Sequence, residues 1–473
     1  MVNSWSGQRL PHPPRRLPVA GDFLAVSPRT PAQSMMSHAD LGPIYELKLF
    51  GQRVVLVNSA ELAAELCDES RFAKALPAAI AALRPFVGDG LVTAYNDEPN
   101  WRLAHDLLMP AFTQGAMRRY HPVMVQASDE LLARWDSAAG PVDVPGDMTR
   151  VTLETIGRAG FSQPFGSFDG DGQHPFVASM VAALAEAQRA ALMAAVPGAR
   201  IFARAAERNY KRKIDYLWEF IDDIIARRRA EGGESVEGGE GPDDLLGLML
   251  NAVHPETGER LDDQNIRYQI LTFLAAGHET TSAALSFTLY YLASNPELAR
   301  RAVEETDAVL GADPGAVPSY EQVPRLRYLR RALDESMRLW PPAPGFGRAP
   351  REDTVIGGRY TMTTDDHAVV LLPRVHRDPA VWGPDAEEFN PDRFAPENSR
   401  GRMPHALKMF GTGERSCIGR QFALHEAVLV LARLLRRYDL ATEPGYELKV
   451  AERATLMPDG FRLRVTPRAP RPR

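Results

Sequence analysis

Residues 270–293, "ILTFLAAGHETTSAALSFTLYYLA", form the segment that most restricts how this chain can fold. As a helix the segment is apolar on nearly every side, so it needs cover all around its circumference. It is long enough to span a bilayer, but its middle carries Glu279, and a carboxylate is costly in lipid. We therefore expect a helix over 262–294 that lies buried at the centre of a large soluble protein.

The composition is consistent with such a protein. The 473 residues are 44% hydrophobic, which is enough for a large core, and we expect one domain over 1–473 with a disordered Pro-rich arm at 1–20. The net charge of −6 gives no bulk attraction to nucleic acid or to a membrane surface. Two cysteines and the lack of an apolar signal-peptide core favour a cytoplasmic location.

Periodic apolar patterns predict that helix predominates. Residues 44–57 read as a β-hairpin, and further short strands are expected within 353–373 and 446–465. The charged, Gly-rich stretch 227–244 reads as a flexible loop. The expected helices cover 59–70, 97–136, 147–160, 175–193, 207–230, 262–294, 296–310, 324–340 and 418–437.

Cys417 stands on a Gly-rich turn, "FGTGERSCIG", just before a helical pattern. Exposed N–H groups at a helix start and the nearby Arg415 favour a thiolate, and Gly411, Gly413 and Gly419 allow a sharp turn and the close approach of a flat group. Cys67, on an apolar helical face, reads as an inert core residue. A nucleophilic role for Cys417 stays open, but an axial thiolate ligand to haem iron explains the glycines better.

The polar cluster "AAGHETT", at 275–281, interrupts the central helix. A zinc site of the His-Glu-x-x-His type is excluded because position 282 is Ser282. The Thr280 hydroxyl could simply bond back to the carbonyl four residues earlier. Alternatively, Thr280 and Glu279 could widen the helix and relay protons to a bound oxygen species.

Two further motifs carry possible ion-pairing residues. Glu335 and Arg338 lie three positions apart on one predicted helix, which suits a salt bridge. Arg393, in "FNPDRF", could join that pair if the chain folds back. Each motif alone is weak evidence.

Taken together and in this order, the four motifs resemble those of the cytochrome P450 superfamily of haem-thiolate monooxygenases. The resemblance runs over nearly the whole chain and implies a mainly α fold with a small β-rich lobe at the N-terminal side. The segments "WRLAHDLLMPAF", "DMTRVTLETIGRAGF" and "GRQFALHEAVLVLARLL" are similar to the haem domain of bacterial fused flavocytochromes that hydroxylate fatty acids.

The resemblance also implies roles for individual residues. Cys417 would be the metal ligand, Thr280 and Glu279 would deliver protons to oxygen, and Glu335, Arg338 and Arg393 would form a structural network. Haem b is the implied cofactor, with O2 as co-substrate. The residues expected to bind the haem are Lys74, Trp101, His105, Ala276, Phe410, Gly411, Arg415, Cys417 and Gly419.

The chain also departs from the fatty-acid enzymes. Gln52 and Leu56 stand where those enzymes use an arginine and a tyrosine to hold the substrate carboxylate, and Val92 stands where they carry a phenylalanine over the haem. We therefore expect a roomier pocket and a hydrophobic substrate such as a fatty acid, a terpenoid or a polyketide-like product. The expected pocket residues are Gln52, Leu56, Leu91, Val92, Ala276, Ala343 and Pro344.

The sequence shows no reductase after residue 473, which predicts a monomer served by a separate electron donor, a ferredoxin or a flavodoxin with its reductase. Lys408, Arg415 and Arg420 are candidates for its docking face. Three alternatives remain: a peroxide-driven haem enzyme, a haem-binding protein without turnover, and a haem-free protein in which Cys417 is structural. The Glu279–Thr280 pair favours O2 chemistry.

Overall fold

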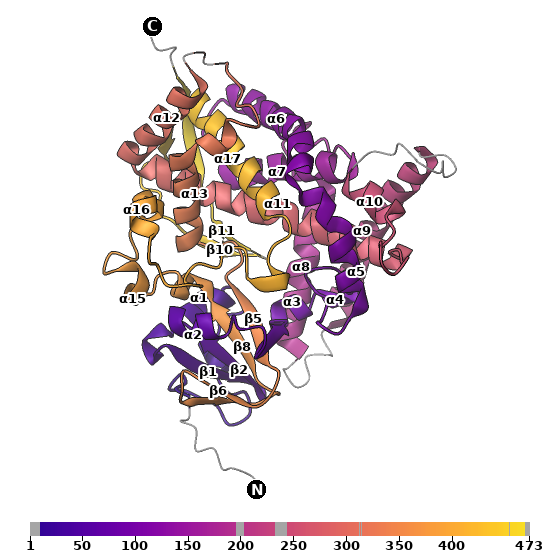
Figure 1. The fold of residues 1–473 in the computed structure, drawn as a ribbon, viewed down its shortest axis with the longest axis vertical. Coiled ribbons are helices and arrows are strands. Elements are labelled where there is room, and N and C mark those ends of the chain that lie inside the picture. The colour runs from indigo at the N-terminus through magenta and orange to yellow at the C-terminus, as the bar shows by residue number, and fades with distance from the viewer. Residues whose placement is uncertain are drawn as a thin grey trace.

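A helix of 32 residues, α11 (Asp263–Ser294), runs through the middle of the molecule (Figure 1). The structure is a computed structural model that describes residues 10–194, 203–231, 244–311, 313, 315–453 and 455–468. The side chain of Asp262 caps α11 by accepting a hydrogen bond from the Asn265 N–H at 2.7 Å. The predicted central helix is confirmed, and it begins one residue after the expected start.

Helix α7 (Val144–Phe161) covers one side of α11 and bonds to its polar middle. A Cβ on Gly277 would lie 2.9 Å from the Ile156 side chain, so the two backbones approach closely only because position 277 is glycine. Thr152 Oγ1 donates to the carbonyl of His278 at 2.9 Å. Contacts of this kind allow a polar cluster to lie inside an apolar core.

The remaining long helices surround α11 and α7. Helices α13 and α17 pack directly against α11, and α6 packs against both α7 and α17. The apolar side chains of these helices form the largest core cluster of the described residues. Their bounds are α5 Pro99–Leu108, α6 Gln114–Asp136, α8 Pro175–Ala194, α9 Ala203–Glu231, α10 Leu245–Asn251, α12 Pro296–Leu310, α13 Arg327–Leu339 and α17 Arg420–Arg437.

A five-stranded sheet forms a second, smaller lobe at the N-terminal end of Figure 1, in the order β1-β2-β8-β5-β3. The predicted hairpin is confirmed as β1 (Ile44–Leu49) and β2 (Gln52–Val57). The late strands β5 (Gly345–Pro350) and β8 (His367–Leu371) lie between the hairpin and β3 (Phe72–Ala75), with β8 parallel to β2. The mainly α fold with a small β-rich lobe is thus confirmed.

Smaller elements complete the described chain. Three strands pair in the order β4-β12-β9, and two further pairs are β6-β7 and β10-β11. Their bounds are β4 Val142–Asp143, β6 Thr354–Ile356, β7 Tyr360–Met362, β9 Tyr438–Thr442, β10 Val450–Glu452, β11 Leu456–Pro458 and β12 Arg462–Pro467. The short helices are α1 Pro31–Met36, α2 Ala60–Glu65, α3 Ala78–Ala81, α4 Arg84–Val87, α14 Leu372–Val375, α15 Pro379–Trp382 and α16 Pro396–Ser399.

Three sequence predictions differ from the structure. The pattern at 97–136 is two helices, because a 3₁₀ turn at Met109–Phe112 with Pro110 inside it separates α5 from α6. The strand expected from Tyr446 begins only at Val450. The arm is ordered from residue 10 onward, with Leu10 buried in the lobe, while residues 1–9 lie outside the described residues. Residues 227–231, expected in the flexible loop, are instead the end of α9, and residues 232–243 lie outside the described residues.

The expected ion-pair network lies at the C-terminal end of α13 and contains Glu335, Arg338 and Arg393. Arg338 Nε lies 2.6 Å from Glu335 Oε2, and Arg393 Nε lies 3.3 Å from Glu335 Oε1. Arg338 also donates to the carbonyls of His376 and Ala386, so this buried charge has several partners. Among the described helices, none is both long and apolar enough to cross a membrane.

Candidate active site

A cavity of about 410 Å³ lies between α11, the loop that carries Cys417 and the β-rich lobe. Most of its surface is apolar, and the charged side chains come from the β-rich lobe and from the Cys417 loop. Its lining comes from segments far apart in the sequence, including α5, α11, β5 and the turn before α17. Of the expected site residues, those that line it are Lys74, Leu91, Val92, Trp101, His105, Ala276, Thr280, Ala343, Phe410, Gly411, Arg415, Cys417 and Gly419.

The Cys417 loop is a tight turn that depends on two glycines. Gly411 and Gly413 have φ values of +73° and +64°, which side chains with a Cβ rarely adopt. A Cβ on Gly413 would also lie 1.9 Å from Oε1 of Glu69. The Cys417 N–H donates to the Phe410 carbonyl at 2.8 Å and closes the turn. The turn thereby holds the Cys417 sulfur at the surface of the cavity.

The thiol of Cys417 is exposed at the cavity surface and surrounded by protein on its other sides. Burial is the largest influence and raises its pKa, while the Gly419 N–H and Arg420 act in the opposite direction. As the sequence predicts, an N–H group at the helix start and a nearby cation favour the thiolate, but the cation is Arg420 and the effect of burial is larger. A metal cation bound at the sulfur would supply the missing charge, since a coordinating thiol is deprotonated outright.

Four cations line the cavity, and none forms an ion pair with a described carboxylate: Lys74, Arg348, Lys408 and Arg415. Of these, Lys74, Arg348 and Arg415 lie close enough to repel one another. Lys74 Nζ donates to the Val92 carbonyl at 2.6 Å, and burial followed by repulsion from Arg415 lowers its pKa to about 7. Arg415 donates to the Tyr95 carbonyl at 2.9 Å, and burial lowers its pKa to about 10. Such a cluster needs an anion to be stable in its ionised form.

Arg348, on β5, is the third cation and was not expected from the sequence. It is 4% exposed, and its Nε has no hydrogen-bond partner. Burial lowers the pKa of Arg348 as well. Strand pairing sets Arg348 directly opposite Lys74 of β3, a register that joins residues 274 positions apart. No local motif marks Arg348, so only the sheet register reveals it.

Trp101 and His105 form one wall beside Arg415. The Arg415 guanidinium carbon lies 3.7 Å from the centroid of the Trp101 ring, and the His105 ring stacks on Trp101 with centroids 5.1 Å apart. The cation–π contact fixes the direction of Arg415 toward the cavity. The expected grouping of these three residues is present in the structure.

On the opposite wall, α11 presents Ala276 and Thr280 to the cavity. Thr280 Oγ1 donates to the Ala276 carbonyl at 2.8 Å, as the back-bonding alternative predicts. Glu279 does not line the cavity; it is 5% exposed and lies toward Thr455 and Arg453. Burial raises the pKa of Glu279. The structure therefore brings Thr280, but not Glu279, to the face opposite Cys417.

Three of the expected pocket residues lie elsewhere. Leu56 is fully buried in a separate cluster with Tyr45, and Gln52 is exposed at the start of β2. Pro344 lies next to the lining residue Ala343, but its carbonyl accepts from Leu372 and the residue is not part of the lining. Strand β2 faces the core of the lobe, and for that reason Gln52 and Leu56 do not reach the cavity.

The residues around the cavity fit a haem. A flat group with two carboxylates would place its charges against Lys74, Arg348 and Arg415, none of which forms an ion pair with a described carboxylate. Cys417 would supply a thiolate ligand, and the loop places two glycines with no side chain, Gly411 and Gly419, beside it in the lining.

The chain belongs to the cytochrome P450 family, whose model matches residues 11–464. It is 45% identical over 460 residues to bifunctional cytochrome P450/NADPH–P450 reductase 1 of Bacillus subtilis, covering 96% of this chain and 42% of that protein. It is 40% identical over 459 residues to a self-sufficient cytochrome P450 monooxygenase of Penicillium expansum, covering 96% of this chain and 43% of the relative. The chain thus spans about two fifths of the length of these curated relatives.

We predict that Arg348→Met weakens haem retention, because the variant keeps a similar apolar volume while it removes a buried charge from the propionate end. Haem transfer to excess apomyoglobin should be faster by about tenfold, the scale of one charge-assisted hydrogen bond. Arg359→Met, at an exposed position in the lobe, is the matched control. Equal transfer rates for the two variants would show that Arg348 does not hold the cofactor.

Proposed function

We propose that this chain is a haem-thiolate monooxygenase that inserts one oxygen atom of O2 into a hydrophobic small molecule, with two electrons and two protons reducing the other atom to water. The observation that carries the proposal is that Cys417 and Thr280, from two different elements, line the same mostly apolar cavity together with cations that form no ion pair with a described carboxylate. The low cysteine content suits a cytoplasmic enzyme, and the cation set suits haem b.

Each group of residues has a separate task in this proposal. Cys417 would hold the iron, and Lys74, Arg348 and Arg415 would neutralise the propionates. Bound haem iron supplies the binding and activation of O2. Apolar side chains exclude water from the reacting face, and the Thr280 hydroxyl holds and passes a proton at Oγ1. Glu279 has no direct role at the reacting face, since its carboxyl does not line the cavity.

Thr280→Ala should uncouple the enzyme, because it removes the hydroxyl that faces Cys417 without altering the helix. We expect the amount of product per electron pair to fall by about tenfold or more, within the range of one proton-transfer group. The measurement is product formed against reductant consumed. Thr280→Ser keeps the hydroxyl and should keep most of the coupling; if it behaves like the alanine variant, the hydroxyl is not the active group.

We further propose that the substrate is a neutral apolar molecule in preference to a fatty-acid anion. The lining away from the lobe end is apolar and includes Ile80, Leu91 and Phe273, and the cations at the lobe end are assigned to the haem. Gln52 and Leu56 lie outside the lining and offer no charge for a carboxylate. Burying a carboxylate without a counter-ion is costly.

Optical titration of the holoprotein tests this preference with three ligands that share a twelve-carbon chain. Dodecan-1-ol and methyl dodecanoate should bind at least about tenfold more tightly than dodecanoate, since only the last must desolvate a charge. The Soret shift gives each dissociation constant. Tighter binding of dodecanoate would contradict a neutral substrate class.

We also propose that electrons come from a separate donor that docks beside the Cys417 loop. Of the three expected docking residues, Arg420 is exposed at the start of α17, whereas Arg415 and Lys408 line the cavity and are partly buried. Arg420 is therefore the candidate that an acidic donor surface can reach.

Arg420→Glu should slow electron transfer from a reduced ferredoxin or flavodoxin, with the larger effect at low ionic strength because salt screens surface charge. Stopped-flow reduction under carbon monoxide measures the rate. Arg359→Glu in the lobe makes the same change in net charge away from the Cys417 loop. If both variants slow reduction equally, the docking face lies elsewhere.

A further inference from the structure

Residues 88–92 lie directly on α11 and supply Leu91 to the lining of the cavity of about 410 Å³. Two glycines allow this close approach. A Cβ on Gly90 would lie 2.3 Å from Thr272 Oγ1, and a Cβ on Gly88 would overlap a tyrosine ring of α11. The position of this segment therefore determines how far one wall of the cavity stands from the central helix.

Two amide side chains of α11 bind the segment at two points. Asn265 Nδ2 donates to Asp89 Oδ1 at 2.9 Å, and the Leu91 N–H donates to Gln269 Oε1 at 3.1 Å. The two amides lie four residues apart on one face of the helix, and Gln269 Nε2 donates to Asn265 Oδ1 at 2.9 Å. We call Asp89, Asn265 and Gln269 the clamp.

The two ends of the clamp fix the donor and acceptor roles within it. A backbone N–H can only donate, so the atom of Gln269 that meets Leu91 must be its oxygen. The NH2 group of Gln269 then faces the oxygen of Asn265, whose own NH2 group faces the Asp89 carboxylate. A carboxylate only accepts, so every bond in this chain has one donor and one acceptor.

Both amides are enclosed by protein, with 1% of Asn265 and 0% of Gln269 exposed. Burying an amide costs free energy unless its hydrogen bonds are made, whereas an apolar side chain at either position would need none. The bond from Gln269 is directional and acts on the backbone of Leu91, a residue that lines the cavity. The clamp therefore fixes where Leu91 lies relative to α11.

Other residues hold the segment on its remaining sides. Asp89 Oδ2 accepts from Asn100 Nδ2 of α5 at 2.8 Å, and Lys74 Nζ donates to the Val92 carbonyl at 2.6 Å. These contacts act on either side of Leu91 in the sequence, whereas Gln269 binds Leu91 itself. Loss of the Gln269 amide would thus free Leu91 while the ends of the segment stay attached.

We propose that Asp89, Asn265 and Gln269 are positioning residues that set the width of the cavity by holding Leu91 against α11. The inference rests on the proposed function, in which this cavity receives the substrate. Gln269 lies about one helical turn before the part of α11 that lines the cavity, so the clamp acts beside the surface that a substrate meets. A wall held by buried hydrogen bonds selects its ligands by shape, and without the clamp the cavity accepts broader molecules.

Optical titration of the haem-loaded protein tests the proposal with two ligands of haem iron, imidazole and 1-tritylimidazole. They share the ring that binds iron, but only the second has three phenyl groups that must fit against the lining. Gln269→Met keeps an unbranched side chain and removes both hydrogen bonds. We expect its affinity for 1-tritylimidazole, relative to that for imidazole, to rise by about threefold or more. A ratio that stays the same or falls overturns the proposal.

Amide hydrogen exchange on the full chain as isolated separates the clamp from the proposed function, because it needs no ligand. Gln269→Met should speed exchange of the Leu91 N–H by about tenfold, the scale of one hydrogen bond. That result in a protein that binds no haem would support the clamp while the proposed function fails. Unchanged exchange at Leu91 in the haem-loaded protein would show that the clamp does not hold this residue.

Thr306→Val is the matched control, because it removes one buried hydrogen bond, from Thr306 Oγ1 to the Ala302 carbonyl, on α12. Thr306 does not line the cavity, so this variant should keep the ligand ratio of the parent protein. Asp89→Ala, at a half-buried position, should act in the same direction as Gln269→Met and serves where that variant does not fold. Equal changes in Thr306→Val and Gln269→Met would mean that lost stability, and not the clamp, alters the cavity.

Discussion

The need to bury α11 on every side determines much of the molecule. Helices α7, α13 and α17 and the strand β11 all pack against it, and its polar middle is tolerated because groups such as the Thr152 hydroxyl bond to its carbonyls. One short stretch, around Ala276 and Thr280, is not covered by another helix and faces the cavity instead. The part of α11 that faces the cavity is thus the part that the neighbouring helices leave uncovered.

Features of the site that depend on neighbouring residues could be predicted from the sequence. The direction in which a side chain points, and contacts between distant segments, could not. The glycines around Cys417 act within a few residues, and α11 is recognisable from its apolar pattern alone. Which way a side chain points from a strand or helix depends on packing partners far away in the sequence. For this reason the sequence suggests Glu279 as a cavity residue, although its side chain leaves α11 on the side away from the cavity. For the same reason the sequence does not reveal Arg348, the strand partner of Lys74.

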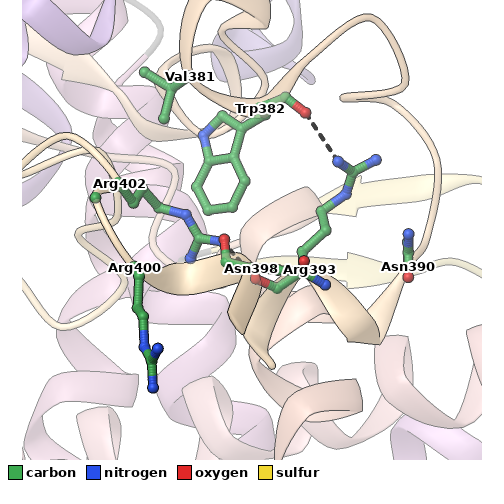
Figure 2. Close-up of a pocket in the computed structure, with 8 residues that line it drawn as sticks. Val381, Trp382, Asn390, Arg393, Asn398, Arg400 and Arg402 are labelled. Carbon is green, nitrogen blue, oxygen red and sulfur yellow. Dashed lines mark hydrogen bonds between the residues drawn. The ribbon is translucent and has the colours of Figure 1, made fainter. Parts of the chain in front are cut away.

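Arginines that form no ion pair with a described carboxylate occur in two very different settings in this fold. Arg348 is enclosed, so its charge can be tolerated only when an anion fills the same enclosure. Arg402 is half-buried at the surface beside Trp382 (Figure 2), where the Trp382 and Phe394 rings stabilise its guanidinium and Glu335 offsets part of its charge.

The cluster of Lys74, Arg348 and Arg415 has a consequence for the life of the chain in the cell. Lys74 and Arg415 repel one another, so an anionic prosthetic group that binds between them would stabilise the folded chain. Partly unfolded chains are removed by cellular proteases. Haem supply would therefore control how much of this protein accumulates, even where its synthesis is constant.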